Sequence, residues 1–416
     1  MDLHEIKGSV VRAGRELAAS GLIARTWGNV SCRINGRQFA ITPSGRLYHN
    51  LTAADIVVVN IADGSYEGEI KPSSEKGIHA AVYSRRRDIN FIIHTHQVNA
   101  SIASVLGQDL DTPHALVPVI GDIIACAAYG LPGSKKLKNN IIAALERSSG
   151  KAFLLANHGA LCFGRDEAEA FTVAFALEEA CAYYMARRYL AVSGRETVEM
   201  NELRELYLLQ LARVAAPAAA DNPEPLFSSE RDGDHFILYP GAAGNGFPPG
   251  SSSVFRLSLA GSAEKRWEAE GIPAEAEIHR QIYKCCSKCN AVIHTAAPDI
   301  HTISRTGQKL LPLLDDFAQM LGTSVETVEI DRIKTAAVKI ARKLKGRNAV
   351  LIKDRGALCT GPTKDDAAAA VMVLEKGCKA AIATAFWGKV KPLNPLDSIL
   401  MRLNYQYRYA RLAAKK

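Results

Sequence analysis

The chain has 416 residues, of which 48% are hydrophobic and 23% charged, and its formal net charge is +8. This composition is that of ordinary globular domains and excludes a disordered, collagen-like or disulfide-stapled chain. The length predicts two or three domains. Lysines and arginines are scattered, with no basic helix or aromatic stacking platform, so we expect no nucleic-acid partner.

No segment has the pattern of a membrane span. The most lipid-like stretch, residues 115–131, is interrupted by Pro118 and Asp122. The N-terminal residues show no basic region followed by an apolar one, which argues against a secretory signal. We therefore expect a cytoplasmic protein with no membrane partner. The nine cysteines are an odd number, and we expect them to be reduced and buried.

The first half of the chain alternates helical and extended patterns. Periodicity and turn residues predict, in order, a helix near 3–20, strands near 29–34, 38–42 and 55–61, a helix near 75–86, a strand at 90–95, helices near 97–105 and 133–148, a strand at 152–156 and a long helix near 166–190. This alternation predicts an α/β fold in which helices cover a sheet.

The two halves of the chain resemble each other. Residues 152–164 have a counterpart 197 residues later, and both segments contain Gly-Ala-Leu-Cys. A second match, with an offset of 200 residues, aligns Ile93-His94-Thr95 with Ile293-His294-Thr295. Because the offsets nearly agree, we predict a tandem duplication. The predicted parts are a first domain over 1–213, an Ala/Pro-rich linker over 214–229 and a second domain over 230–416.

Three histidines of the first half have the spacing of a metal site. His94 and His96 follow an apolar run, and residues two apart on a strand project to the same face, so both rings can reach one ion. His158 stands at the end of another apolar strand. Three histidines leave a tetrahedral zinc ion one open position, as catalytic sites require. Hydrogen-bonded histidines at sheet ends are the alternative.

A second group of residues has the pattern of an anion site. Ser73 and Ser74 precede Glu75 and a predicted helix, where hydroxyls and free backbone N–H groups suit a phosphate. Ordinary helix capping is the alternative explanation. Asn29 and the turn at residues 42–45 are by themselves typical turn residues.

Taken in order, the motifs G-N-V-S, T-P-S-G, P-S-S-E, H-T-H and N-H-G resemble the class II aldolase/adducin family, most closely its L-fuculose-phosphate aldolase branch. The resemblance covers about residues 3–212 and reaches the second half only through the internal repeat. It implies a three-layer α/β/α domain with a largely antiparallel central sheet, here duplicated in tandem. It also implies a homo-oligomer, either a dimer that mimics the tetramer of the family or a higher assembly.

The family pattern implies a role for each matching residue. His94, His96 and His158 would bind one zinc ion per chain, and Glu75 would be the catalytic acid/base. The residues implied to bind the substrate phosphate are Asn29, Ser44, Gly45, Ser73 and Ser74. The implied reaction is cleavage of a phosphorylated ketose, a small-molecule sugar phosphate, to dihydroxyacetone phosphate and an aldehyde through a zinc-stabilised enediolate. The aldehyde stays open, and so does the metal, because three imidazoles bind several divalent ions.

Two other functions stay open. An epimerase or dehydratase would use the same zinc site, and an adducin-like scaffold would keep only the fold. Glu75 follows the two serines where the pentulose-phosphate 4-epimerase branch usually has Asp, which favours aldol cleavage. Ala115 follows His114, at a position where the fuculose-phosphate aldolases have a tyrosine. A scaffold has no reason to keep three histidines and a glutamate together.

The second half keeps only part of this set, so we predict a degenerate domain. His294 and Glu275 match His94 and Glu75, but Ala296 and Arg355 replace the other two histidines. Pro273-Ala274 replaces the two serines. Arg355 would suit an anionic ligand, and a purely structural domain is the alternative. Residues 285–289, Cys-Cys-x-x-Cys, have no second cysteine pair to complete a metal site, so we expect packed cysteines at a helix end.

Overall fold

The computed structural model describes residues 2–23, 27–214, 227–240, 255–261, 271–388 and 390–409. The chain divides into two compact units. The first unit runs to Glu196 and includes Phe386–Val390 and the residues from Tyr407 on, and the second comprises Thr197–Ala385 and Lys391–Gln406. Residues 215–226 of the predicted linker lie outside the described residues.

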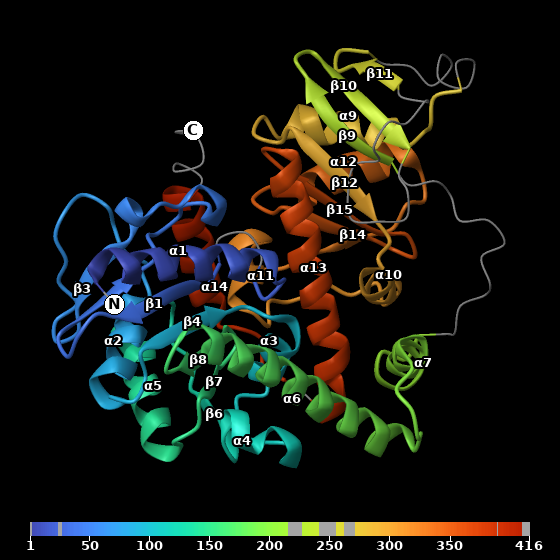
Figure 1. The fold of residues 1–416 in the computed structure, drawn as a ribbon. Coiled ribbons are helices and arrows are strands. Elements are labelled where there is room, and N and C mark those ends of the chain that lie inside the picture. Colours follow the sequence, from blue (N-terminus) through green and yellow to red (C-terminus); the bar gives the residue numbers. More distant parts are fainter. Residues whose placement is uncertain are drawn as a thin grey trace. The chain divides into compact units, whose positions relative to one another are not determined.

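The first unit is built on an eight-stranded sheet with the order β3-β2-β1-β4-β8-β7-β6-β5 (Figure 1). The strands are β1 (Asn29–Arg33), β2 (Gln38–Ile41), β3 (Val57–Asn60), β4 (Phe91–Thr95), β5 (Leu110–Asp111), β6 (Ile123–Ala127), β7 (Ala152–Leu155) and β8 (Gly159–Gly164). Neighbouring strands are antiparallel, except that β6 runs parallel to β7. The predicted, largely antiparallel sheet is therefore confirmed.

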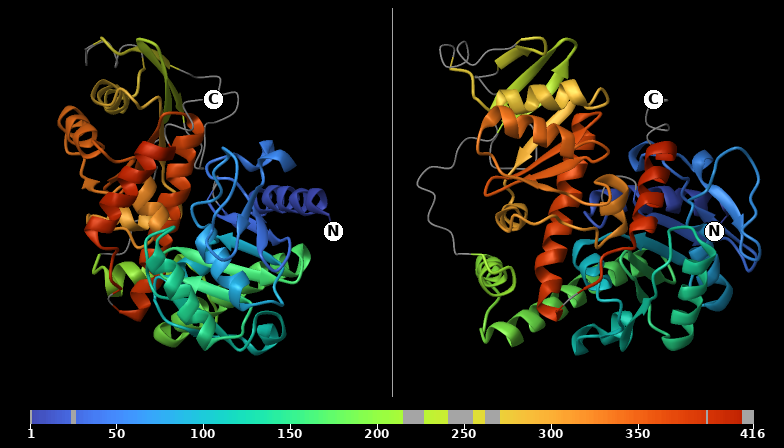
Figure 2. Two further views of the ribbon diagram at one scale, coloured as in Figure 1. Left: turned by 90° about the vertical axis from the view of Figure 1, so that its left-hand side faces the viewer. Right: turned by 180° about the vertical axis from the view of Figure 1, so that it is seen from behind.

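Helices cover both faces of this sheet (Figure 2). One face carries α1 (Leu3–Ala19), α3 (Val98–Ser104) and α6 (Glu167–Ser193), the other carries α2 (Lys76–Arg85) and α5 (Lys135–Arg147), and α4 is a short helix (Val117–Ile120). Successive side chains of a strand point to opposite faces. Phe91 and Ile93 of β4 accordingly join the core beneath α1 and α6, whereas Ile92 joins the core beneath α2 and α5. The predicted three-layer α/β/α architecture follows from these two cores.

The second unit repeats this plan with a seven-stranded sheet of order β11-β10-β9-β12-β15-β14-β13. Its strands are β9 (Phe227–Asp232), β10 (His235–Pro240), β11 (Phe255–Ser258), β12 (Ala291–Thr295), β13 (Thr327–Val328), β14 (Ala349–Ile352) and β15 (Gly356–Gly361). Its helices are α7 (Met200–Leu206), α9 (Ala276–Cys285), α10 (Pro298–Arg305), α11 (Asp315–Met320), α12 (Ile333–Lys343), α13 (Lys364–Thr384) and α14 (Pro395–Asn404). Here α9 and α12 pack on one core of the sheet, and α13 packs on β12 and β15.

The predicted elements of the first half are present, but strands β5, β6 and β8 and helix α4 were not predicted, and two strand boundaries in the chain differ from the prediction. Strands β6 and β8 were not predicted, because both are short apolar runs that lack polar alternation and β8 has glycine at each end. Strand β3 begins at Val57 because residues 53–55 form a 3-10 turn. Strand β9 begins at Phe227, inside the range predicted for the linker.

The structure also tests the expectations about membrane spans and about the cysteines. Among the described helices, none combines the length and the apolar character needed to cross a bilayer. The cysteines are free thiols and mostly buried, but Cys285 is exposed and Cys286 is partly exposed. Cys289 lies in the core and Cys286 packs against it at the end of α9, so the expectation of packed cysteines was wrong for Cys285 alone.

Candidate metal centre and active site

Three buried histidines converge at the end of strand β4. His94 is the fourth residue of this strand, His96 follows it directly, and His158 lies in the turn between β7 and β8. Their ring centroids are 4.8, 4.9 and 5.0 Å apart, and none of the three exposes more than 6% of its surface. Strand β4 ends at Thr95, as the strand predicted at 90–95 does, and the ring of His96 directly after it meets that of His94.

The N-H-G motif builds the turn that carries His158. Asn157 adopts a left-handed conformation with φ of 59°, which asparagine tolerates better than most residues. Gly159 pairs with Leu155 across the turn. A Cβ atom at Gly159 would overlap the carbonyl oxygen of Thr95, so only glycine lets β8 approach β4 this closely. The motif therefore presses His158 against the strand that carries His94.

The protein also determines which nitrogen of His94 faces the cluster. Its Nδ1 lies 2.9 Å from the carbonyl oxygen of Ala160, and because a carbonyl only accepts, Nδ1 carries the hydrogen. Nε2 is the nitrogen that faces the cluster, 3.1 Å from the Nε2 of His96, and is the atom that would bind a metal. Metal-binding histidines typically use their second nitrogen in this way, to hold the ring and its tautomer.

Glu75 completes the cluster from the start of helix α2. Its Oε2 lies 3.2 Å from Nε2 of His94, and its Oε1 lies 3.3 Å from Nε2 of His158. The side chain is buried, which by itself would raise the pKa of Glu75. The nearby charges of His94 and His158 outweigh the burial and hold the pKa of Glu75 well below its ordinary value. The carboxylate is therefore an anion in this arrangement of the three rings.

This donor set fits a divalent cation. Three nitrogens bound tetrahedrally at about 2.0–2.1 Å from one zinc ion would lie about 3.3 Å from each other. The ligand atoms of His94, His96 and His158 all lie within 4.8 Å of one another, and one pair is 3.1 Å apart. Among the described residues, this is the group of three or more His, Cys, Asp or Glu side chains that could hold a metal ion.

Four of the five predicted phosphate-binding residues come together next to Glu75. The turn containing Ser44 and Gly45 runs beside the segment containing Ser73 and Ser74. The backbone N–H of Ser44 bonds the carbonyl of Lys71 at 2.9 Å, and that of Ser73 bonds the carbonyl of Thr42 at 3.0 Å. The two segments therefore form one wall, which is continuous with Glu75 and the start of α2.

Asn29, the fifth of these residues, has a different environment. It is 3% exposed, and its Nδ2 donates to Oε2 of Glu75 at 3.1 Å. Its Oδ1 faces Nε2 of His79 at 2.5 Å. Both ends of the amide therefore serve hydrogen bonds within the protein. Sequence reasoning did not assign His79 to the site, although its position one helical turn after Glu75 was a signal that it lies on the same side of α2.

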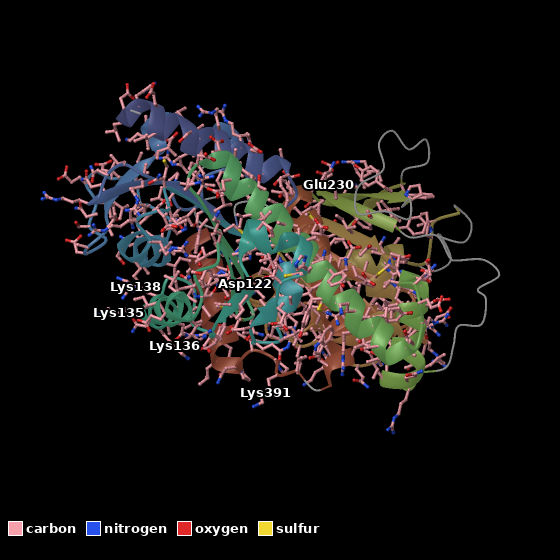
Figure 3. All side chains as sticks on the ribbon, turned by 60° about the horizontal axis from the view of Figure 1, so that its bottom comes forward. Asp122, Lys135, Lys136, Lys138, Glu230 and Lys391 are labelled. Carbon is pink, nitrogen blue, oxygen red and sulfur yellow. The ribbon has the colours of Figure 1, made fainter. Side chains whose placement is uncertain are left out.

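Positive charge gathers beside the serine segment. Figure 3 shows Lys135, Lys136 and Lys138 together at the start of α5. Gly133, just before this helix, packs so closely on Ser74 that a Cβ atom there would lie 2.8 Å from the Ser74 carbonyl oxygen. Lysines in a first turn oppose the helix dipole. Gly133 places the start of α5 next to Ser74, and the side chain of Lys138 approaches Gly77 of α2.

Comparison with known proteins identifies the family. The sequence model of the Class II Aldolase and Adducin N-terminal domain matches residues 8–185 and 248–382. A 5-deoxy-D-ribulose 1-phosphate aldolase of Bacillus thuringiensis serovar kurstaki is 36% identical over 187 residues, which are 44% of this chain and 86% of that protein. An L-fuculose phosphate aldolase of Haemophilus influenzae is 32% identical over 186 residues, which are 44% of this chain and 84% of that protein.

Solved structures include an L-fuculose 1-phosphate aldolase with 33% sequence identity and a TM-score of 0.42, covering 49% of this chain and 93% of the other. The two matched regions fall in the two halves that the internal repeat relates. The chain therefore belongs to the class II aldolase and adducin family, whose domain it carries twice in tandem.

Proposed function

We propose that this chain is a metal-dependent aldolase that cleaves a ketose 1-phosphate to dihydroxyacetone phosphate and an aldehyde. The first unit would hold the active site, and the second would be catalytically silent. The observation that carries the proposal is the convergence of three buried imidazoles and one buried carboxylate, with Glu75 oxygens 3.2 and 3.3 Å from His94 and His158. The relatives named above act on sugar phosphates of this class.

His94, His96 and His158 would hold the metal, which we propose to be Zn²⁺ because three imidazoles are a common catalytic zinc set. When bound, the ion supplies Lewis acidity that polarises a substrate carbonyl and stabilises developing negative charge. The chain keeps the His94 ring in the required tautomer through Ala160. It also buries all three rings, which keeps competing water away from the site.

Glu75 would move the proton of the reaction. In cleavage the C4 hydroxyl gives up its proton as the aldehyde C=O forms and the C3–C4 bond breaks. The electron pair of that bond stays at C3, and this carbon must take a proton before dihydroxyacetone phosphate is released. A buried carboxylate that is held as an anion can remove this proton in the synthetic direction and return it in cleavage. The hydrogen bond from Asn29 fixes the direction in which Oε2 points.

The serine wall would bind the substrate phosphate. Ser44, Ser73 and Ser74 would offer their hydroxyls and Gly45 its backbone beside Glu75, and Asn29 would assist through the second hydrogen of its Nδ2. The lysines at the start of α5 add an attractive field for a dianion. Binding energy from a phosphate remote from the reacting bond positions the C3–C4 bond for cleavage.

Metal content is the first test of the proposal. Wild-type chain purified without chelator is expected to carry about one zinc per chain, and His96→Ala is expected to lose it. The wild type is then offered 5-deoxyribulose 1-phosphate and L-fuculose 1-phosphate, and triose phosphate is followed by coupled NADH oxidation. A chain that binds no metal even when zinc is supplied would contradict the proposal and favour a non-catalytic scaffold.

We further propose that the chain self-associates, as a dimer that mimics the family tetramer or as a higher assembly. Sedimentation of the metal-loaded protein at several concentrations tests this. A strict monomer with full activity would contradict it.

A further inference from the structure

A chain of buried hydrogen bonds leads from the core of the first unit to Glu75. It runs from Tyr83 on α2 through Ser31 on β1, His79 on α2 and Asn29 on β1 to the carboxylate. The four links measure 2.8, 2.6, 2.5 and 3.1 Å in that order. The five side chains are all buried, so no bulk water competes for these bonds.

The direction of every link can be deduced. The Nδ2 of Asn29 must face the Glu75 carboxylate, since a carboxylate only accepts, so Oδ1 faces His79. Oδ1 also only accepts, so Nε2 of His79 carries the hydrogen. Burial, and then the nearby charge of His94, lower the pKa of His79 to about 3, so the ring is neutral.

The remaining links follow from the neutral ring. Nδ1 of His79 accepts from the Ser31 hydroxyl, and Ser31 in turn accepts from Tyr83. All four donors therefore point along one line toward Oε2 of Glu75. With His79 neutral, the links from Ser31 to Glu75 have a single direction and hold the Asn29 amide with its N–H on the carboxylate. The Tyr83 hydroxyl has a second, longer contact, 3.4 Å from the carbonyl oxygen of Asn90.

We propose that His79 is a positioning residue for Glu75 and acts through Asn29. This inference rests on the proposed function, in which Glu75 is the acid/base. It makes the orientation of Glu75 the main role of Asn29 and phosphate binding a secondary one. Without the hydrogen bond from His79, the Asn29 amide is free to turn over and present its oxygen to the carboxylate. The carboxylate then loses the donor that fixes Oε2, and a catalytic group that is loosely held loses rate.

The second unit shows which part of this chain belongs to the fold alone. Ser229, His279 and Tyr283 repeat the Ser-His-Tyr arrangement, with links of 2.7 and 2.8 Å. Phe227 stands where the first unit has Asn29, and His279 instead lies 3.8 Å from Glu275. The three-residue arrangement therefore packs helix to sheet in both units, and the asparagine link to a carboxylate is special to the first unit.

Proton exchange tests this role without knowledge of the aldehyde. Metal-loaded protein is incubated with dihydroxyacetone phosphate in D₂O, and loss of the C3 proton signal is followed by NMR. His79→Leu and Ser31→Ala are expected to lower the maximal exchange rate about 10–100-fold, as is typical when a supporting hydrogen bond is lost. The KM for dihydroxyacetone phosphate is expected to stay within about twofold, and bound metal is expected to be unchanged.

Conservative and matched variants separate positioning from stability. His79→Gln places an amide N–H near the former Nε2–H, and we expect it to recover part of the rate. His279→Leu and Ser229→Ala remove the equivalent groups of the second unit, and we expect them to lower the unfolding midpoint but not the exchange rate. If His79→Leu does not fold, Ser31→Ala and Tyr83→Phe carry the test.

Three results would overturn the role of His79. They are an unchanged exchange rate in the variants, a change confined to KM, or an equal loss of exchange in His279→Leu. Wild-type protein that binds metal but exchanges no proton would overturn the proposed function and this role with it. An active wild type whose exchange is insensitive to His79→Leu and Ser31→Ala would overturn this role alone.

Discussion

His94 and His294 occupy equivalent places in the two units but use their ring nitrogens in opposite ways. Each is the fourth residue of its strand and pairs with a leucine of the neighbouring strand. His94 donates from Nδ1 to Ala160, which leaves Nε2 for the cluster. His294 donates from Nε2 to the Arg355 carbonyl at 2.9 Å, and its Nδ1 lies 2.6 Å from Glu275.

The difference separates the proposed metal site of the first unit from a histidine–glutamate contact in the second. Both nitrogens of His294 face acceptors, so Nε2, the nitrogen that the first unit leaves for its cluster, is taken by the Arg355 carbonyl, and Nδ1 contacts Glu275. Glu275 is buried, and a buried carboxylate is costly without a partner. Once Ala296 and Arg355 replaced the two other imidazoles, the same histidine and glutamate were left to satisfy each other. A retained motif residue is therefore no evidence of a retained ligand.

The largest expected difference between the units is catalytic. Glu75→Gln keeps the shape of the side chain but removes the base, and we expect kcat to fall about 10²–10⁴-fold. Glu275→Gln is the matched variant and is expected to leave kcat unchanged while lowering stability. Steady-state assays and thermal unfolding of both variants measure this. A comparable loss of kcat in Glu275→Gln would show that the second unit takes part in catalysis.

Gly159 and Gly356 lie in equivalent hairpins of the two units, and replacing each of them compares the units through packing. A Cβ atom at Gly159 would overlap the carbonyl of Thr95, and one at Gly356 would overlap that of Thr295. We expect each alanine variant to lose about 1–3 kcal/mol of unfolding free energy by overpacking. Gly159→Ala is expected to lower metal content as well. The added Cβ atom would push β8 away from β4, and the turn that holds His158 would move with β8. Urea unfolding and metal analysis check both effects, and a loss of activity in Gly356→Ala would contradict them.

Acid stability is expected to depend on the ion pair of the second unit. Burial would raise the pKa of Glu275, but hydrogen bonds from His279 and His294 and the charges of these rings lower it from 4.5 to about 2. A lowered folded-state pKa stabilises the fold above the unfolded pKa, and this stabilisation is lost as the pH falls from about 4.5 to about 2. The contribution amounts to up to about 3 kcal/mol.

To test this pH dependence, the urea unfolding midpoints of wild type and Glu275→Gln are measured between pH 6 and pH 2.5. The variant is expected to be less stable near pH 6, and the difference in unfolding midpoint between the two proteins is expected to become smaller as the pH falls. A gap that is constant over this range would show that the Glu275 charge contributes nothing.

The smallest expected effect concerns the lysines at the start of α5. Replacing Lys135, Lys136 and Lys138 with glutamine weakens the field near the serine wall, so we expect the KM for the sugar phosphate to rise a few-fold and to depend less on salt. The kcat is expected to be unchanged. Lys334→Gln with Lys339→Gln on α12 of the second unit is the matched control. An equal rise in KM in this control would show a general effect of net charge.

Much of this protein could be predicted from residues that are close together in the sequence. The internal repeat, the histidine spacing and the glycine and proline turns are local patterns, and they were sufficient to predict the duplication and the α/β fold. The N-H-G motif is an example, because left-handed backbone at Asn157 and close strand approach at Gly159 depend on residue type alone. Strands β6 and β8 lacked such a local signal, because burial on both faces removes the polar alternation.

Only the tertiary structure decided what each of these side chains does. The ring of His94 is oriented by a carbonyl 66 residues away, and Asn29 is held between His79 and Glu75, which come from a helix about 50 residues later. His94 and His294 are the same residue in the same strand pattern, and the local change from His96 to Ala296 does not tell which ring nitrogen each of them uses. Hydrogen-bond direction in a buried site depends on every neighbouring donor and acceptor, and those neighbours are brought together only by folding.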